Sequence, residues 1–429
     1  MSELSYLEKL LDGAEVEWLA LGQIAKKIYS GGTPDTKKNE YWENGNIPWM
    51  SSGEVNLKIV YETEKFITET GLKNSSAKFV PKNSIVMALA GQGKTRGKVA
   101  RTRIDLTTNQ SLAAITLDEK TSCSDYIFHF LETQYEALRQ LSSGNSGRGG
   151  LNLQMISAYK VPIPCPKNPE KSLAIQAEIV RILDKFTALT AELTAELTAE
   201  LTERKKQYNY YRDQLLSFEE GDVEWKTLGD VTKKWYSGGT PTAGKAEYYE
   251  NGEIPWLRTQ EVKFSDINST EIKITQAALK NSAAKWIPEN CVIIAISGAT
   301  AGRSAINKIP LTTNQHCGCL EIDDTKALYR YVFHWVSFNY ENIKSLGQGA
   351  RGDINSTIIK NFKLPIPYAT APDKSLEEQA RIVEILDKFD TLTNSITEGL
   401  PREIELRQKQ YEYYRDLLFS FPKPDSVTN

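Results

Sequence analysis

A run of basic side chains with no acidic residue among them is the first feature of this sequence that could do chemistry. The run spans residues 91–103, and its cations are Lys94, Arg96, Lys98, Arg101 and Arg103. Lysine and arginine bind phosphate groups, and such contacts supply much of the affinity of DNA-binding proteins. The whole chain carries a formal net charge of −3, so any attraction for nucleic acid must be local. We interpret the run as a candidate DNA contact, although any single residue in it could be a solvated surface charge.

Two polar stretches shortly after a Pro-Trp pair are candidate base readers. They are Ser51-Ser52 and Arg258-Thr259-Gln260, and side chains of these types can hydrogen-bond to base edges. Further arginines stand in predicted loops rich in glycine. The predicted DNA contacts are Ser51, Ser52, Lys94, Arg96, Lys98, Arg101, Arg148, Arg258, Thr259, Gln260, Arg303 and Arg351.

The segment Ala88–Thr95 allows a different interpretation, because it loosely matches a phosphate-binding loop. In that case Gly93-Lys94-Thr95 would cradle a nucleoside triphosphate. Three observations count against this alternative. The first position is alanine, the equivalent segment 298–303 lacks the lysine, and residues 98–104 alternate like a strand where a helix is required. The alternative function that such a loop would imply is a nucleoside-triphosphate hydrolase.

Other candidates for catalysis or metal binding are weak. His316-Cys317-Gly318-Cys319 has no second ligand pair, so we expect two half-buried thiols in a strand. His129 and His334 lie between aromatic residues, which predicts packed histidines on helices. The sequence contains no recognisable methyltransferase or hydrolase motif. We therefore expect no catalytic residue, no metal and no cofactor in this chain.

The bulk composition is that of an ordinary globular protein of at least two domains. The chain has 429 residues, of which 40% are hydrophobic and 25% charged. Its five cysteines form no disulfide framework, and no apolar run is long enough to span a membrane. These features predict a cytoplasmic location and no membrane partner.

The loops described above belong to two copies of one unit. Tyr29-Ser30-Gly31-Gly32-Thr33-Pro34 returns at residues 236–241, and Thr107-Thr108-Asn109-Gln110 returns at residues 312–315. The offset falls from 207 to 205 between these two matches, and to 203 near the end of each copy. Length changes confined to loops are expected of duplicated units. Each copy is therefore predicted to hold a globular part of about 150 residues and a long helix.

The long helices must position the globular parts. From Ser172 to Phe218 there is no glycine or proline, and apolar residues recur every three or four positions. At ~1.5 Å per residue this helix would be roughly 65–70 Å long. A second stripe follows at an offset of 203, and Gly399-Leu400-Pro401 predicts a kink or restart in it. The predicted coiled-coil contacts are Ile182, Phe186, Leu189, Leu193, Leu197, Leu201, Tyr208, Ile385, Phe389, Leu392, Ile396 and Tyr411.

The predicted fold class is α+β. Short strands at residues 84–89 and 291–296 and amphipathic helices at 126–141 and 329–346 would form two homologous mixed α/β domains. Two long helices would separate these domains and pair as an antiparallel coiled coil with pseudo-twofold symmetry. Such symmetry would suit two half-sites in inverted orientation on duplex DNA. The ordinary alternative is that each helix packs separately on a local core.

The signature that ends each copy resembles a known family. Val161-Pro162-Ile163-Pro164 is followed by Gln176-Ala177-Glu178-Ile179 and Ile182-Leu183-Asp184, and all three return in the second copy, at 364–367, 379–382 and 385–387. This pattern resembles the DNA-specificity subunit of type I restriction–modification enzymes, over essentially the whole chain. Three Thr-Ala-Glu-Leu repeats at residues 190–201 are similar to those of the type IC subfamily.

The resemblance implies a division of labour. Residues 1–165 and 219–368 would be target-recognition domains that each read one half of a split site in double-stranded DNA. Residues 166–218 and 369–429 would be spacer helices that hold two methylation subunits. Those partners would carry S-adenosylmethionine and adenine N6-methylation. Restriction subunits would add cleavage driven by ATP with Mg²⁺, and this chain would recognise DNA without catalysing.

Overall fold

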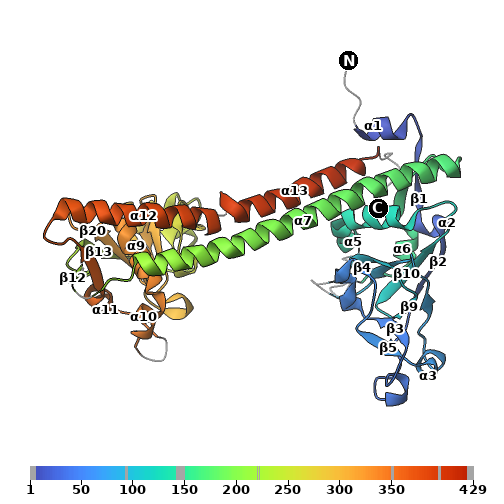
Figure 1. The fold of residues 1–429 in the computed structure, drawn as a ribbon, viewed down its shortest axis with the longest axis horizontal. Coiled ribbons are helices and arrows are strands. Elements are labelled where there is room, and N and C mark those ends of the chain that lie inside the picture. The colour runs from blue at the N-terminus through green and yellow to red at the C-terminus, as the bar shows by residue number, and fades with distance from the viewer. Residues whose placement is uncertain are drawn as a thin grey trace. The chain divides into compact units, whose positions relative to one another are not determined.

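The chain forms two compact units that we describe separately. The computed structural model describes residues 6–91, 95–141, 150–219, 221, 223–348, 352–394 and 398–422. Unit 1 comprises residues 1–195 and 405–429, and unit 2 comprises residues 196–404. We call residues 16–164 head 1 and residues 223–367 head 2. Figure 1 shows the sheets of each head and the long helix α7 (Pro169–Leu215). The domain boundaries drawn from the sequence stay a prediction.

Head 1 is built on three sheets. A five-stranded sheet has the order β2-β10-β7-β8-β4, a four-stranded sheet the order β5-β3-β9-β6, and β1 pairs with β11. The strands are β1 (Val16–Ala20), β2 (Ala25–Ser30), β3 (Ile47–Met50), β4 (Ile59–Val60), β5 (Lys65–Ile67), β6 (Phe79–Val80), β7 (Ile85–Ala88), β8 (Val99–Thr102), β9 (Leu106–Thr108), β10 (Leu112–Leu117) and β11 (Lys160–Pro164). The helices are α1 (Tyr6–Leu11, which precedes the head), α2 (Leu21–Ile24), η1 (Asn39–Tyr41), η2 (Ser52–Leu57), α3 (Glu69–Lys73), α4 (Ser124–Thr133), α5 (Tyr135–Leu141) and α6 (Leu153–Ala158).

Head 2 repeats this plan with one strand fewer in the second sheet. Its sheets have the orders β13-β20-β17-β18-β15, β16-β14-β19 and β12-β21. The strands are β12 (Val223–Thr227), β13 (Thr232–Ser237), β14 (Ile254–Leu257), β15 (Asp266–Ile267), β16 (Ile272–Ile274), β17 (Val292–Ala295), β18 (Ser304–Asn307), β19 (Thr312–Thr313), β20 (Cys317–Ile322) and β21 (Lys363–Pro367). The helices are η3 (Ala246–Tyr248), η4 (Thr259–Glu261), α8 (Gln276–Lys280), η5 (Gly298–Thr300), α9 (Tyr329–Phe338), α10 (Tyr340–Ser345) and α11 (Ser356–Asn361).

The largest core cluster of each head includes one face of its five-stranded sheet and one amphipathic helix, and a second cluster lies on the other face of the sheet. Strands β7 and β17 are buried at every position, as expected of apolar runs covered on both faces. Helix α4 covers the sheet of head 1, and α9 covers the equivalent sheet of head 2. The predicted helices 126–141 and 329–346 are each broken once, because the chain turns at Gln134 and at Asn339. Cys317 and Cys319 are fully buried, so the expectation of half-buried thiols was wrong.

The long helices form over the two predicted apolar stripes. Helix α7 starts at Pro169, in the first turn where proline is tolerated, and runs for 47 residues. The second stripe is divided into α12 (Pro372–Asn394) and α13 (Gly399–Leu418), which confirms the predicted restart. Gly399 has φ +75°, and a Cβ there would lie 2.5 Å from the carbonyl oxygen of Thr391.

The two apolar stripes contact each other inside each unit. In unit 1 the ring of Phe186 stacks on that of Tyr414 at 5.6 Å, and the Thr187 hydroxyl lies 3.1 Å from the hydroxyl of Tyr411. In unit 2 Tyr211 stacks on Phe389 at 5.4 Å. The partner's number falls as the number along α7 rises, so the paired helices run antiparallel. The predicted α+β fold with an antiparallel helix pair is therefore confirmed.

Candidate nucleic-acid interface

An equivalent glutamate holds the candidate base-reading turn of each head. Glu54 accepts hydrogen bonds from the backbone N–H groups of Ser51 (2.6 Å) and Glu64 (3.0 Å). Glu261 does the same for Arg258 (3.1 Å) and Glu271 (2.8 Å). Each glutamate is nearly buried, and its hydrogen bonds hold the backbone of the turn in place. Side chains on these turns can then differ between the heads while the backbone stays the same.

The side chains on these turns differ in their availability. Ser51 and Ser52 are partly exposed, and Gln260 is exposed. Arg258 is partly exposed, and its guanidinium makes ion pairs with Glu271 and Glu261. Thr259 is only 9% exposed, so its side chain has little surface to offer a base and this prediction is not supported.

The basic loops carry equivalent cations at two positions, Lys98 with Arg303 and Arg103 with Lys308, and Arg103 is ion-paired with Asp125. Lys98 lies directly before β8, and Arg303 lies directly before the matching strand β18. Both are partly exposed, and Nζ of Lys98 donates to Oδ1 of Asn56 at 2.7 Å. Arg96 is also partly exposed. The predicted contacts Lys94, Arg148 and Arg351, and Ile396 of the coiled coil, lie outside the described residues.

The phosphate-loop alternative receives no support from the strand that follows it. After residue 97 the chain enters β8, which pairs antiparallel with β7. A phosphate-binding loop needs a helix at this position, because the helix N-terminus supplies the anion site. The hydroxyl of Thr95 donates to the carbonyl oxygen of Ala90 and is buried.

Arg101 is the clearest error among the predicted DNA contacts. Its side chain is buried, and Nη2 lies 3.0 Å from Oδ1 of Asp184 on α7. Nη1 forms an ion pair with Asp125 at 3.2 Å, and the guanidinium lies over the ring of Phe128. A cation held by two carboxylates and an aromatic ring is not available to a phosphate. Arg101 therefore joins head 1 to α7.

The partner residues of this cluster were not predicted from the sequence. His129 Nε2 also lies 2.9 Å from Oδ1 of Asp184, so the histidine is packed as expected but also hydrogen-bonded. Burial alone would raise the pKa of Asp184, but hydrogen bonds from His129 and Arg101 outweigh it and hold that pKa at about 2. The available signal was the aspartate that follows Ile-Leu in both copies of the family signature.

A polar hollow in head 2 was also not predicted from the sequence. It measures about 510 Å³ and opens where β13 and β17 end and β20 begins, three strands adjacent in one sheet. Nδ1 of His316 lies 2.6 Å from the hydroxyl of Ser297, and Gln315 links His316 to Thr240. In head 1 the Thr33–Gln110 contact is kept, while Ser111 follows in the position of His316. The two heads therefore present different polar groups at this end of the sheet.

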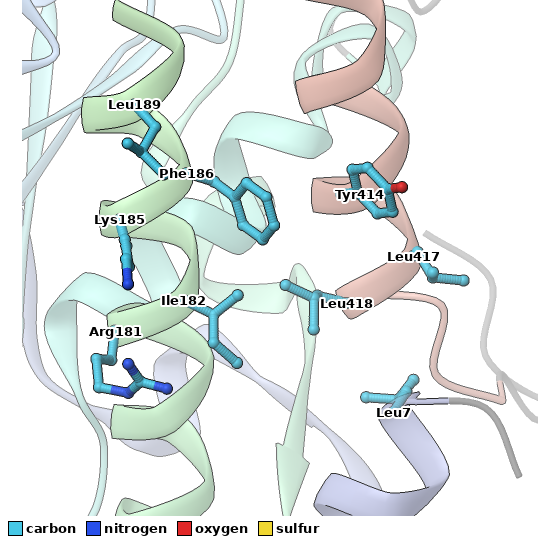
Figure 2. A pocket seen from close by; sticks show the side chains of 9 residues that line it. All are labelled: Leu7, Arg181, Ile182, Lys185, Phe186, Leu189, Tyr414, Leu417 and Leu418. Carbon is cyan, nitrogen blue, oxygen red and sulfur yellow. The ribbon is translucent and has the colours of Figure 1, made fainter. Parts of the chain in front are cut away.

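The helix pair of unit 1 leaves an apolar groove open. Figure 2 shows it between α7, α13 and α1, with apolar side chains facing the space and two basic side chains on α7 beside it. The groove has a volume of about 520 Å³. Leu189 is 52% exposed and Phe186 is 37% exposed, so the pairing covers them incompletely. The lining residues are Leu7, Arg181, Ile182, Lys185, Phe186, Leu189, Tyr414, Leu417 and Leu418.

The remaining predicted stripe residues are partly buried. Tyr411 is 9% exposed, and the others are of intermediate exposure. They are Leu193, Leu197, Leu201, Tyr208, Ile385, Phe389 and Leu392. Within the part of the chain that the structure describes, no helix is long and apolar enough to cross a membrane, and no cluster of three or more His, Cys, Asp or Glu side chains could hold a metal.

Two homologous α/β heads, each fixed to a long helix of an antiparallel pair, define the chain as a duplicated recognition protein. The family described as "Type I restriction modification DNA specificity domain" matches residues 14–203 and again residues 220–406. The chain belongs to this family of type I restriction–modification specificity subunits.

Individual relatives agree with this assignment. The Escherichia coli "Type I restriction enzyme EcoR124I/EcoR124II specificity subunit" is 45% identical over 440 residues, which covers all of both chains. The EcoprrI specificity subunit of the same species is 36% identical and covers 93% of each. A solved structure from a study of complex assembly in "the type I R-M system" has a TM-score of 0.61, 15% identity and coverage of 94% of this chain and 97% of that one. At this identity the last likeness shows the fold alone.

Proposed function

We propose that this chain recognises a split DNA site, with one half-site bound by each head, for a type I restriction–modification complex. The observation that carries this proposal is the repetition of the whole head in one chain that belongs to the specificity-subunit family. Each head offers an anchored polar turn, and Lys98 and Arg303 are partly exposed cations at equivalent positions of the two basic loops. Phosphate contacts by Lys98 and Arg303 would place the heads, and the polar turns would read base edges.

The long helix α7 would set the spacing between the half-sites. Four residues advance an α-helix by ~6 Å and turn it by a net angle of about 40°. One base pair of B-DNA turns by about 34–36°, given 10–10.5 pairs per turn. One Thr-Ala-Glu-Leu repeat therefore nearly preserves the angular phase between the heads. Its rise exceeds the ~3.4 Å of one base pair, so bending must absorb the difference.

The partners proposed for the helices are two methylation subunits. Exposed apolar residues along a helix pair are typical of a surface that another protein covers. The groove of unit 1 has this character, with Leu189 and Phe186 only partly covered. The methylation partners would supply S-adenosylmethionine and adenine N6-methylation, and restriction subunits would supply ATP- and Mg²⁺-dependent cleavage. This chain would itself be non-catalytic and would act in the cytoplasm, where its DNA lies.

Methylation-sensitive sequencing tests this function directly. The chain is expressed with its methylation partners in a host that lacks other adenine methylation. We expect methylated adenines in one motif made of two short defined halves and an unspecified spacer of fixed length. Replacement of head 2 by the head of a relative should change one half of the motif and leave the other unchanged. A single undivided motif, or a change in both halves, would contradict the proposal.

A further inference from the structure

An aspartate in each long helix forms the same contacts with its own head. Asp184 on α7 and Asp387 on α12 occupy the same place in the repeated Ile-Leu-Asp-Lys-Phe segment. Oδ1 of Asp387 lies 2.6 Å from Nε2 of His334 and 2.6 Å from Nη2 of Arg330. These contacts match those of Asp184 with His129 and Arg101. His129 lies on α4 and His334 on α9, and both are almost completely buried. Each histidine–aspartate contact therefore joins the core helix of a head to its long helix.

The arginine reaches the aspartate from a different element in each head. In head 1 it is Arg101 on strand β8, whereas the strand residue paired with it, Ile59, is apolar. In head 2 the position of Arg101 is taken by Ile306, and its strand partner is Asp266. The arginine of head 2 is the second residue of α9, where α4 of head 1 has Asp125.

The charges of strand and helix are thus exchanged between the heads. Head 1 places Arg101 on the strand and Asp125 on the helix, and head 2 places Asp266 on the strand and Arg330 on the helix. An arginine nevertheless reaches the long-helix aspartate in both, at 3.0 Å and 2.6 Å. Two different solutions to one contact indicate that the contact itself is required, because unconstrained charges would not be exchanged as a pair.

A second polar contact joins each head to its long helix. Eight residues before each aspartate, a buried glutamine accepts a hydrogen bond from the backbone at the start of the head's core helix. Gln176 binds the N–H of Cys123 at 2.8 Å, and Gln379 binds the N–H of Leu328 at 2.9 Å. Apolar packing around these residues is not directional, whereas hydrogen bonds to charged groups are. Ile179 and Leu183 of α7 pack in the same apolar core as head 1, and the two polar contacts add direction to that packing.

We propose that Asp184 and Asp387 are positioning residues that lock each head onto its own long helix in one orientation, so that the complex accepts one spacing between half-sites. This role rests on the proposed function. Neither aspartate touches DNA in the proposal, because both lie on the long helices and are occupied by the head's own cations. Loss of the aspartate leaves the glutamine contact and the shared apolar core in place, so the head should shift in orientation without detaching.

The first test measures the orientation without DNA. Spin labels on ketone-bearing residues at Glu119 in head 1 and Glu192 on α7, both exposed, report the distance between head and helix. We expect Asp184→Asn to broaden the distance distribution. The control Asp213→Asn makes the same change on the same helix, at an exposed aspartate paired only with its neighbour Arg212, and should leave the distribution unchanged. An unchanged distribution in Asp184→Asn would overturn the lock.

The second test measures spacing in the complete complex with its methylation partners. Methylation rates are compared on DNA whose half-sites are separated by the preferred spacer or by one pair more or fewer. Because misplacement by about 1 Å can cost about 10²-fold, we expect Asp184→Asn to reduce the preference for the correct spacer about tenfold. An equal loss of rate at every spacer length would overturn the proposal, since it would indicate general damage. A wild-type complex that methylates no split site would refute the proposed function, and the label distances would still decide on the lock.

A third test transfers the charged residues of head 2 to head 1, and it distinguishes loss of the contact from misfolding. Arg101→Ile gives head 1 the residue of head 2 and should broaden the label distances as Asp184→Asn does. Arg103 donates to both oxygens of Asp125, and head 2 has Lys308 at its position, so this residue must change as well. Adding Asp125→Arg, Ile59→Asp and Arg103→Lys gives head 1 the charged residues of head 2 around Asp184. We expect this quadruple variant to narrow the distances and restore the spacer preference. Failure of the quadruple variant to recover either property, in a protein that remains folded, would contradict an interchangeable arginine.

Discussion

Charged side chains serve three separate purposes in each copy of the repeated unit. Glu54 and Glu261 are nearly buried and hold the backbone of the candidate reading turns. Asp184 and Asp387 hold the heads on their helices. Lys98 and Arg303 are partly exposed and stand in equivalent positions. The four carboxylates carry the wrong charge for a phosphate and are held by partners within the chain, so we assign phosphate binding to Lys98 and Arg303.

Removal of Lys98 should weaken DNA binding without changing the sequence preference. Each phosphate contact contributes about 0.9 to the slope of log K against log salt concentration. Lys98→Ala should therefore reduce that slope by about 1 in the assembled complex, and Lys98→Ala with Arg303→Ala by about 2. The control is Lys120→Ala, which removes an exposed lysine outside the predicted contacts. An unchanged slope in the double variant would exclude both residues from the interface.

Protonation of Asp184 should make the protein less stable in acid. Hydrogen bonds hold its pKa at about 2, against an ordinary value of 3.8. A carboxylate whose pKa is lower in the folded state stabilises the fold above its unfolded pKa, and this stabilisation is lost as the pH falls through the folded pKa. After allowance for its partial exposure, we expect about 1–2 kcal/mol at pH 7, lost between roughly pH 4 and pH 2.

The measurement is urea unfolding of wild type and Asp184→Asn at several pH values. The difference between their midpoints should be largest near pH 7 and should shrink as the pH approaches 2. A difference that stays constant over this range would show that the charge of Asp184 contributes nothing to stability.

Residue roles were the part of the site that the sequence could not supply. Arg101 lies in a run of cations, and residues 98–104 alternate as a strand does, so sequence alone suggested an exposed side chain. All four residues of β8 are buried, because α4 and α7 cover a strand face that local sequence does not show as covered. The partners of Arg101 are 24 and 83 residues away along the chain. No local pattern records contacts of that separation.

The helices, by contrast, were predictable because their signal is local and long. A stripe repeated over more than forty residues without glycine or proline leaves little choice of structure. The glycine and proline at 399–401 marked the restart correctly for the same reason. The sequence did not show that the pairing leaves Phe186 and Leu189 partly uncovered. Coverage depends on the neighbouring helix, and apolar periodicity alone does not reveal it.

A charge placed in the groove of unit 1 should block assembly with the methylation subunits. Leu189 is 52% exposed, so Leu189→Asp should change the free energy of unfolding by no more than about 0.5 kcal/mol. Binding of the methylation subunits should weaken at least about tenfold, which corresponds to 1.4 kcal/mol. Ala191→Asp, an exposed position two residues further on and turned by about 200° around the helix, is the matched control. Sedimentation of the complexes measures the affinity of each variant for the methylation subunits. Equal affinities of the two variants would show that the groove is not the docking surface.

At the scale of the whole molecule, one duplicated design accounts for the sequence. The two heads share their sheet plan, their glutamate anchors and their contacts to the long helices. They differ in the polar groups at the reading turns and beside His316. Shared scaffold with different surface groups is what a protein needs if it reads two different half-sites. In the proposed function, α7 is the element that sets the spacing between the half-sites.

The most direct test of this account changes the length of that helix. Deletion of Thr194–Leu197 removes one repeat from α7, and the methylation complex is assayed on sites whose spacer varies by single base pairs. The account predicts that the preferred spacer becomes one base pair shorter while both half-sites stay the same. Glu196→Gln, an exposed change that keeps the length, should leave the preference where it was. If the deletion variant is active and keeps the original spacer, α7 does not set the spacing.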